Sequence, residues 1–369
     1  MNICIYEWAM HRIGGGQKVF IKMAEALSEN HKVELLSLYN VDKKDLEKIY
    51  SADLSKVNLI FLFNSKDYKK ESYFHTLSAG KVSRISSNYD LFINSNHETV
   101  IPQSRKSIIY FHFPERKIYR NARNLADGII LLGYALIKTL YGNHSRSYDL
   151  VLCNSEYTKR WLKMLWIINA FVLNPPIDID RIKRKKLNII LSAGRIAKDK
   201  NYSFMISCFK KISEKHRDYE YLICGEGDFS GLKKEAKNFP VRFAGHLESS
   251  KLRENYSKSK IFFHAKGYGR NELKEPQEME HFGMVTAEAM AQGAVPVVFN
   301  GGGQKEIVEH KKSGFLFNNP EEAQDFITFL IENEGLREKM SRNAVKKARE
   351  YSTKNFQDKF KELCKKICS

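Results

Sequence analysis

Two glutamates eight residues apart mark the part of the sequence whose residue types are best suited to chemistry. Glu280 and Glu288 lie in the segment EHFGMVTAEAMAQGAVPVVFNGGGQKE, which begins at the first of them. The residues between them predict a helix over 284–292, preceded by Gly283 and ended by Gly293. Glu280 then lies just before a helix N-terminus, where free N–H groups and the helix dipole attract anions. Carboxylates flanking such a site can hold the hydroxyls of a nucleotide-sugar while the helix holds its phosphates, and the surrounding glycines and apolar residues argue against a solvated helix face.

This segment resembles the signature of glycosyltransferase family 4 of the GT-B superfamily. The family pattern is E-x7-E, read as E-x-F-G, then E-A-M-A-x-G-x-P-V, then G-G and E. The matching residues are Glu280, Phe282, Gly283, Glu288, Ala289, Met290, Ala291, Gly293, Pro296, Val297, Gly302, Gly303 and Glu306. The resemblance implies a retaining, nucleotide-sugar-dependent transferase in which Glu280 is catalytic and Phe282, Gly283, Met284 and Glu288 bind substrate. The EHFG variant is similar to mannosyltransferases of lipid-linked oligosaccharide synthesis.

A second segment, GRIAKDK, resembles the G-R-x4-K segment of the same family. The resemblance implies that Arg195 and Lys200 bind the donor diphosphate and act in catalysis. Physically, the departing nucleoside diphosphate gains negative charge, and two cations stabilise that gain. Gly225 begins a segment, GEGD, that is similar to the family's G-x-G turn beside the nucleotide.

The first half of the chain carries two weaker matches. Gly14 and Gly15 belong to a GGGQ segment that resembles the family's G-G-x-E loop near the phosphates and the acceptor. Gln17 stands where the family has glutamate, so a role for that carboxylate is not carried over. His112 follows an apolar strand-like run, as does the family histidine that faces the donor sugar, and a buried structural histidine is the alternative.

The phosphate-binding groups predict a transferase that needs no divalent metal and no cofactor, with a UDP- or GDP-linked sugar as substrate. The sequence Asp178-Ile179-Asp180 has the D-x-D form of a metal motif, but it follows Pro175-Pro176. A turn and helix cap is the better interpretation there. The long segment 265–279 directly precedes Glu280, and it either closes over the substrate or is a surface excursion.

The elements that must position these residues alternate between strand and helix. Apolar runs predict strands at 2–6, 32–38, 59–63, 91–93, 107–111, 150–153, 188–192, 219–224, 261–264, 295–299 and 314–317. Glycine turns and amphipathic stretches separate them, as in doubly wound α/β sheets. The proline pair and the basic run after it predict a domain boundary. We therefore expect the α/β GT-B fold: two Rossmann-like domains facing a central cleft, with ranges 1–175 for the acceptor and 187–350 for the donor, and a helix over 352–369 packing back on the first domain.

The composition limits the classes of partner. The chain has 369 residues and a formal charge of +18, from 61 basic and 43 acidic residues. Such an excess indicates an anionic partner: nucleic acid, acidic lipid or a phosphorylated substrate. Because the basic residues form no Arg-rich or aromatic-interleaved block, we expect no nucleic acid partner. Peripheral association with an anionic membrane remains an expectation.

The location follows from cysteine usage and hydropathy. The six cysteines form no CxxC pair, which fits a reducing compartment. The first residues lack the features of a signal peptide, and no apolar run is long enough to span a bilayer. The strongly apolar stretch 129–140 is interpreted as a core helix, with an interfacial or acceptor-lining helix as the alternative. We expect a cytoplasmic protein with peripheral contact to the inner membrane face.

The sequence therefore predicts a hexosyltransferase that moves mannose or glucose from a nucleotide-sugar to a glycan or lipid-linked acceptor. Two other classes stay open. One is a GT-B-fold sugar-nucleotide enzyme that is not a transferase. The other is a protein that binds an anionic polymer or membrane, as the net charge suggests.

Overall fold

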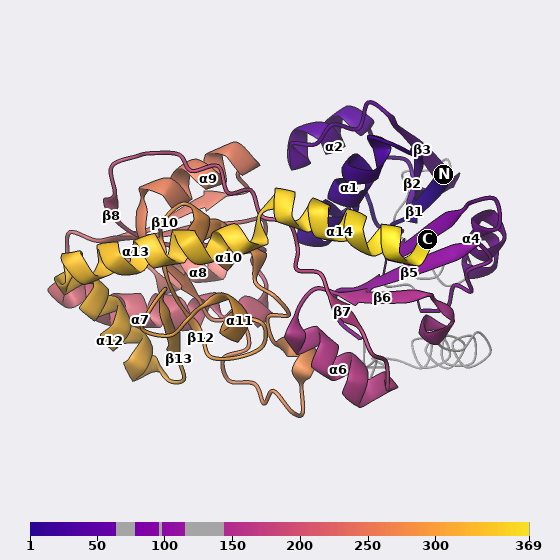
Figure 1. The fold of residues 1–369 in the computed structure, drawn as a ribbon. Helices are drawn as coiled ribbons and strands as arrows, with labels where there is room; N and C mark the ends of the chain where they lie inside the picture. The colour runs from indigo at the N-terminus through magenta and orange to yellow at the C-terminus, as the bar shows by residue number, and fades with distance from the viewer. Residues whose placement is uncertain (64–77, 96–97, 115–143, 369) are drawn as a thin grey trace. The chain divides into compact units, whose positions relative to one another are not determined.

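The computed structural model describes residues 1–63, 78–95, 98–114 and 144–368. The chain divides into two compact units (Figure 1). Unit 1 comprises Met1–Asn174 and Gln357–Ser369, and unit 2 comprises Pro175–Phe356. In the described ranges, no helix combines the length and the apolar character needed to cross a bilayer. The apolar stretch 129–140 lies outside the described residues.

Unit 1 is built on a parallel sheet in the order β3-β2-β1-β4-β5-β6-β7. Its strands are β1 (Asn2–Tyr6), β2 (Lys32–Tyr39), β3 (Val57–Phe63), β4 (Leu91–Ser95), β5 (Lys106–Phe111), β6 (Leu150–Cys153) and β7 (Phe171–Val172). The central strands β1, β4 and β5 are nearly continuous apolar runs, because a parallel sheet covered by helices buries both of its faces. The order reverses beside β1, as in doubly wound folds.

The helices of unit 1 within the described residues are α1 (Gly15–Ser28), α2 (Lys43–Tyr50), α4 (Ala79–Ser86) and α6 (Glu156–Trp166), with a short 3₁₀ turn at Ser145–Ser147. Helix α1 begins four residues before the stretch whose apolar periodicity is visible in the sequence. Its first turn contains Gly15 and Gly16, which carry no side chain and therefore add nothing to that periodicity.

Unit 2 repeats the plan with a second parallel sheet, in the order β10-β9-β8-β11-β12-β13. Its strands are β8 (Leu187–Ala193), β9 (Glu220–Cys224), β10 (Val241–Gly245), β11 (Ser259–His264), β12 (Val295–Phe299) and β13 (Phe315–Phe317). Its helices are α7 (Tyr202–Lys215), α8 (Ser230–Glu235), α9 (Ser249–Lys258), α10 (Met284–Ala291), α11 (Gln304–Ile307), α12 (Pro320–Glu332) and α13 (Glu334–Ala348). Short 3₁₀ turns lie at Lys198–Lys200, Pro276–Glu278 and Arg349–Tyr351.

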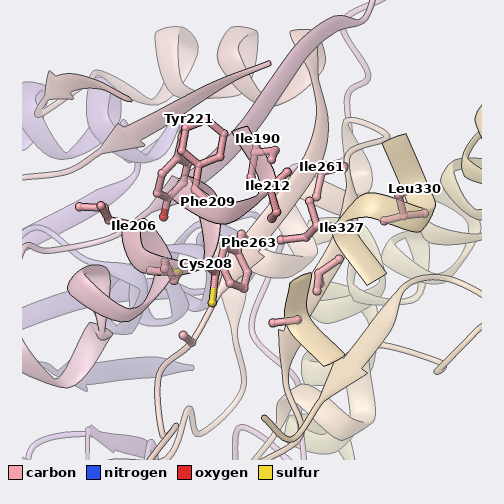
Figure 2. Close-up of a cluster of buried hydrophobic side chains, with 14 of the residues drawn as sticks. Ile190, Ile206, Cys208, Phe209, Ile212, Tyr221, Ile261, Phe263, Ile327 and Leu330 are labelled. Atoms are coloured by element: carbon pink, nitrogen blue, oxygen red, sulfur yellow. The ribbon is translucent and has the colours of Figure 1, made fainter. Parts of the chain in front are cut away.

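Two clusters of buried apolar side chains pack against the second sheet, one on each face. Figure 2 shows the first, in which Phe209 of α7 meets Tyr221 and Phe263 of the sheet, and Ile327 and Leu330 come from α12. The ring centroids of Phe209 and Tyr221 lie 5.4 Å apart. The two faces fix the sheet, and the sheet in turn fixes where its strands end.

The last helix, α14 (Thr353–Cys368), begins in unit 2 and continues in unit 1. In unit 1, Gln357 donates a hydrogen bond to a carboxylate oxygen of Glu25 at 2.8 Å. Phe360 and Cys364, two members of the apolar stripe visible in the sequence, are buried. The terminal helix therefore returns to the first domain, as expected.

The strand pattern of the sequence is confirmed in the interior of both sheets, whereas β10 and β7 have no counterpart among the predicted strands. Both are edge strands. Strand β10 is only partly buried and contains the exposed Arg242, and β7 has two residues. A strand that buries one side only does not form the continuous apolar run that identifies a central strand.

Candidate active site

The predicted helix behind Glu280 is α10, and a glycine fixes where it begins. Gly283 has a φ of 107°, in the left-handed region, and a Cβ added there would lie 3.0 Å from the side-chain amide of Gln304. No side chain caps the helix at this residue. The helix ends at Ala291, one residue before the predicted limit, and Gly293 follows with a φ of 78°, as the glycine that the sequence predicts beyond the helix. The N-terminus of α10 therefore follows Glu280 by four residues, with its first N–H groups free of a side-chain cap.

Glu280 lies at the centre of a buried charged cluster. Its Oε2 is 3.0 Å from Nζ of Lys200, and both side chains are mostly buried. Burial acts to raise the pKa of the Glu280 carboxyl, but Lys200, Lys266 and His264 outweigh it and hold the pKa well below its usual range. Glu280 is therefore ionised and able to accept hydrogen bonds, and Lys200, predicted to bind phosphate, donates one to it.

His264 is a member of this cluster that the sequence did not single out. It is the last residue of β11, and its Nε2 lies 3.5 Å from Oε2 of Glu280. Burial, followed by the charge of Lys200, lowers the pKa of His264 to about 3, so its ring is neutral near pH 7. Its Nδ1 lies 3.3 Å from Nε2 of Gln304. If that amide donates to Nδ1, the ring proton is on Nε2 and faces Glu280. The available signal was its place at the carboxyl end of a predicted strand, where ligands bind in such sheets.

The segment that carries Arg195 and Lys200 joins β8 to α7. Asn201 ends its 3₁₀ turn, and the Asn201 side-chain amide donates to the carbonyls of Ala265 and Tyr268. This bracing fixes Lys200 against Glu280. Arg195 lies on the same segment with an exposed side chain.

Gly225 lets the turn after β9 approach the segment that carries Arg195. Its φ is 156°, and a Cβ added to it would lie 1.8 Å from the carbonyl oxygen of Gly194. The N–H of Gly194 donates to the carbonyl of Cys224 at 3.0 Å. The structure thus gives Gly225 a packing role, holding the turn after β9 against the segment of Arg195. Binding of the nucleotide by Gly225 stays a prediction.

Glu288 lies on α10, half-buried. Burial raises the pKa of the nearby Tyr256 well above its usual value, and the charge of Glu288 adds to that shift. Phe282 is buried beside the ring of Tyr351, with centroids 5.2 Å apart, so its side chain packs the core. Met284 is partly buried at the first position of α10.

A glycine-rich turn packs against the backbone of Glu280. The N–H of Gly303 donates to the Glu280 carbonyl at 2.8 Å, and a Cβ at Gly302 would lie 2.2 Å from that oxygen. Segment 265–279 is tied to this turn, because Oε2 of Glu272 accepts hydrogen bonds from the Gly302 N–H at 3.3 Å and from Nζ of Lys305 at 3.0 Å. The segment is thus a brace for the turn behind Glu280, rather than an unattached surface excursion.

The remaining candidates, Gly14, Gly15 and His112, belong to unit 1. Gly14 precedes α1, and its N–H donates to the Tyr50 hydroxyl at 3.1 Å, while Gly15 is the first residue of the helix. His112 follows β5, and a Cβ added at Gly16 would lie 3.2 Å from its Nε2. Burial lowers the pKa of His112 to about 4, so this ring is also neutral near pH 7.

A buried carboxylate that the sequence did not single out also lies in unit 1. Glu7 follows β1 directly; its Oε1 accepts the N–H of Ala9 at 3.0 Å, and its Oε2 accepts the hydroxyl of Ser95. Burial raises the pKa of Glu7, and the hydrogen bonds, including one from Gln17, oppose the rise. Gln17, which stands where the family has glutamate, therefore donates a hydrogen bond to the carboxyl group of Glu7.

The D-x-D segment holds the start of the last helix. Thr353 Oγ1 lies 3.2 Å from a carboxylate oxygen of Asp178 and donates toward it. The N–H of Thr353 donates to the carbonyl of Ile177 at 3.0 Å. Within the described ranges, no group of three or more histidine, cysteine, aspartate or glutamate side chains is arranged to hold a metal ion.

Comparison with known proteins bears on the family and the fold of the chain. Residues 176–347 match the family model for glycosyl transferases group 1. A GDP-Man:Man(3)GlcNAc(2)-PP-Dol alpha-1,2-mannosyltransferase of Dictyostelium discoideum is 26% identical over 79% of this chain, which spans only 56% of that protein. The protein of the same description from Xenopus tropicalis is 23% identical over 94% of this chain and 83% of its own length.

Solved structures share the fold. Anabaena HepE in complex with UDP superposes with a TM-score of 0.74 over the whole of both chains, at 16% identity. Sucrose-phosphate synthase of Thermosynechococcus elongatus gives 0.73 over 99% of this chain and 98% of its own, also at 16% identity. The chain therefore has the GT-B fold of two Rossmann-like α/β domains. Together with the family model and the relatives, this supports a GT-B glycosyltransferase.

Proposed function

We propose that the protein is a retaining hexosyltransferase that moves mannose or glucose from a GDP- or UDP-linked donor to a glycan or lipid-linked acceptor. The carrying observation is the pair formed by Lys200 and Glu280, 3.0 Å apart at the start of α10. An ammonium group and an ionised carboxylate at that spacing suit a ligand whose phosphate is directly bonded to a sugar. The relatives named for GDP-Man favour mannose as the sugar and GDP as the carrier.

In the proposed reaction, the bond between the anomeric carbon and the diphosphate oxygen breaks, and the acceptor oxygen bonds to the same face of that carbon. Lys200, Arg195 and the N–H groups of α10 stabilise the charge that develops on the diphosphate. The leaving diphosphate takes the acceptor proton. Glu280 accepts hydrogen bonds from sugar hydroxyls and orients the ring.

His264 suits a supporting position in this scheme because it is neutral and adjacent to Glu280. A neutral ring can donate to Glu280 without cancelling its charge. His112 and the Gly14–Gly15 backbone stay candidates for the donor sugar and the acceptor side through the family resemblance.

We further propose that the reaction needs no divalent metal, because two cations and a helix N-terminus supply the charge that a metal would otherwise provide. Initial rates should be equal with and without EDTA. Activity that disappears with EDTA and returns with Mg²⁺ or Mn²⁺ would contradict this part of the proposal.

The test of function is a donor screen followed by a transfer assay. We expect thermal shifts with GDP-mannose, or else with a UDP-hexose, and transfer of labelled sugar to a lipid-linked glycan. Glu280→Gln should nearly abolish transfer, and Glu338→Gln, which changes an exposed carboxylate on α13, is the control. Consumption of the donor without a sugar-bearing acceptor would favour a non-transferase enzyme. Salt-sensitive polyanion binding without donor binding would favour a binding protein.

We also propose a cytoplasmic location with peripheral association at an anionic membrane, since a lipid-linked acceptor has to be reached at a bilayer surface. The net charge of +18 supports this association.

A further inference from the structure

A cavity of about 580 Å³ lies in unit 2, lined by residues of α12, α13, the turn 311–314 and the first residue of β13. Because β11, β12 and β13 run parallel, β13 starts at the end of the sheet opposite to the one where β11 finishes at His264. The cavity is therefore separate from the charged cluster around Glu280.

The cavity has an apolar lining, made of Phe315, Phe326, Phe329, Leu336 and Met340. The rings of Phe315 and Phe326 are stacked with their centroids 4.4 Å apart, and the ring of Phe329 meets Phe315 edge-on at 5.8 Å. Phe315 is buried, whereas Phe329 and Leu336 are 37% and 47% exposed. A concave apolar cavity of this volume with few polar groups is typical of a small-molecule site.

The walls of the cavity are fixed by hydrogen bonds of the folded chain. The side-chain amide of Asn343 on α13 donates to the carbonyl of Lys312 at 2.9 Å. Helices α12 and α13 are joined by the single residue Asn333, and the Arg337 guanidinium donates to the carbonyl of Leu330 at 3.2 Å. The cavity thus exists before a ligand binds, which reduces the ordering cost of binding.

The charged residues of the lining are Lys311, Lys312, Lys339 and Asp325. The ammonium group of Lys312 pairs with Glu309 at 2.5 Å. Among the described residues, no carboxylate is paired with Lys311 or Lys339. Two unpaired ammonium groups against the one carboxylate of Asp325 leave the lining with an excess of positive charge, which is complementary to an anion.

We propose that this cavity binds one amphiphilic anion free in solution, with an apolar body and a single carboxylate of the fatty acid class. The apolar body packs on the phenylalanine rings and Leu336, and the carboxylate contacts Lys311 or Lys339. The volume suits one small ligand rather than a partner protein. The inference does not rest on the proposed transfer reaction, because the cavity and the cluster around Glu280 lie at opposite ends of the sheet.

The test is calorimetric titration of the full chain with dodecanoate below its critical micelle concentration. We expect one molecule bound per chain, with a dissociation constant on the order of 10–100 μM. Dodecyltrimethylammonium has the same apolar chain and the opposite charge. It should bind at least about tenfold more weakly, because its head group is repelled by the two lysines.

Variants of the cavity should weaken dodecanoate binding in proportion to the contact they remove. Phe329→Gln should weaken it about tenfold and Leu336→Gln about fivefold, because each replaces an apolar contact. Replacing both Lys311 and Lys339 by glutamine should remove the preference for the anion. The melting temperature of each variant shows whether it is folded, and Leu336→Gln keeps the test valid if Phe329→Gln is destabilised.

Two matched controls lie in unit 2 outside the cavity. Leu273→Gln changes an apolar side chain that is 69% exposed, and Lys346→Gln changes an exposed cation on α13. Both should bind dodecanoate as the wild type does. Equal weakening in Leu273→Gln and Phe329→Gln would indicate adsorption to the surface and overturn the proposal.

Three further outcomes would overturn it: equal binding of the two detergents, wild-type affinity in folded Phe329→Gln and Leu336→Gln, or no binding of dodecanoate below about 1 mM. Displacement of dodecanoate by nucleoside diphosphate would place it in the candidate active site and also contradict the proposal. Vesicles of phosphatidylcholine and phosphatidylglycerol test the other source of such a ligand. Vesicle binding that requires Phe329, without binding of free dodecanoate, would make this face a bilayer contact instead. Donor binding and sugar transfer are measured separately, so the failure of either proposal leaves the other standing.

Discussion

Each unit buries a glutamate near the carboxyl ends of its strands, and the pKa values of the two carboxyl groups are shifted in opposite directions. Glu7 in unit 1 is held by hydrogen bonds from Ser95 and the Ala9 N–H, and burial raises its pKa. In Glu280 of unit 2, burial acts in the same direction, but Lys200 and Lys266 reverse it and the pKa falls well below its usual range.

The difference teaches that neighbouring charge, rather than burial, decides which carboxyl group serves as an ionised acceptor. Hydrogen bonds from neutral donors only reduce the cost of burying Glu7, whereas the ammonium groups around Glu280 favour its ionised form. The same ammonium groups are the ones suited to a diphosphate. In the proposed function, unit 2 therefore combines the acceptor for sugar hydroxyls with the binding groups for phosphate.

The strongest test of this contrast replaces each of the two glutamates by glutamine in a separate variant. Glu280→Gln should lower the transfer rate by about 10³ or more, because a preorganised charged contact to the sugar is lost. Nucleoside diphosphate should still bind, as measured by calorimetry, because Glu280 holds the sugar. Glu7→Gln should change the rate by less than about tenfold. Equal losses in both variants would remove the contrast, and a loss of nucleotide binding in Glu280→Gln would move Glu280 to the nucleotide.

The cations should give the next largest effect. Arg195→Ala and Lys200→Ala should each lower the rate by about 10²–10³, and the double variant should lose less than the product if the two act as a unit. Lys198→Ala is the control, since Lys198 is an exposed cation on the same segment. An Arg195→Ala enzyme with the wild-type rate would remove Arg195 from the phosphate site.

Two glycine substitutions test whether the backbone near the unit 2 site tolerates an added Cβ less well than a helix of unit 1 does. Gly225→Ala should lower the free energy of unfolding by about 2–4 kcal/mol, because its Cβ would overlap the Gly194 carbonyl oxygen at a φ disfavoured for alanine. Gly80→Ala in α4 of unit 1 meets no atom within 4 Å and should raise it by about 0.5–1 kcal/mol. Urea unfolding measures both; a neutral Gly225→Ala would show that the turn relaxes freely.

Glu288→Gln should weaken nucleotide binding about tenfold, the loss of one hydrogen bond to a charged acceptor. The family resemblance assigns the ribose to this glutamate. Calorimetry with the nucleoside diphosphate measures the effect. Unchanged affinity would mean that the two glutamates of the E-x7-E pattern have been assigned in the wrong order.

The smallest effect is a dependence of stability on pH that has opposite signs for the two glutamates. The folded pKa of Glu280 is depressed, so its contribution is present above the ordinary value of 4.5 and is lost as the pH falls below it. The folded pKa of Glu7 is raised, so stability is lost as the pH rises from 4.5 through the folded value. Urea unfolding of both variants measures the free energy of unfolding against pH. Glu280→Gln should remove part of its fall below pH 4.5, and Glu7→Gln should remove part of its fall above pH 4.5. Slopes of the same sign would contradict the assignment of charge.

Much of the fold was accessible from the sequence because central parallel strands are continuous apolar runs. Asn2–Tyr6, Leu150–Cys153 and Val295–Phe299 have the predicted limits. Edge strand Val241–Gly245 was missed because none of its residues is fully buried and Arg242 interrupts its apolar run. The E-x7-E segment was found because its glycines and apolar residues define a helix and its two ends. His264 and Glu7 were missed because nothing local distinguishes a polar residue at the end of a strand from any other.

The sequence by itself determined the two α/β units, the helix that follows Glu280 and the presence of cations in a phosphate-type segment. These depend on periodicity, on glycine conformations and on local motifs, which act over a few residues. Only the tertiary structure decided that Lys200, 80 residues before Glu280, lies 3.0 Å from it, and that His264 completes the cluster. It also decided that Glu272 braces the glycine turn behind Glu280. The physical reason is that a buried group's charge state depends on which charges the fold places within a few ångströms of it, and sequence separation carries no information about that distance.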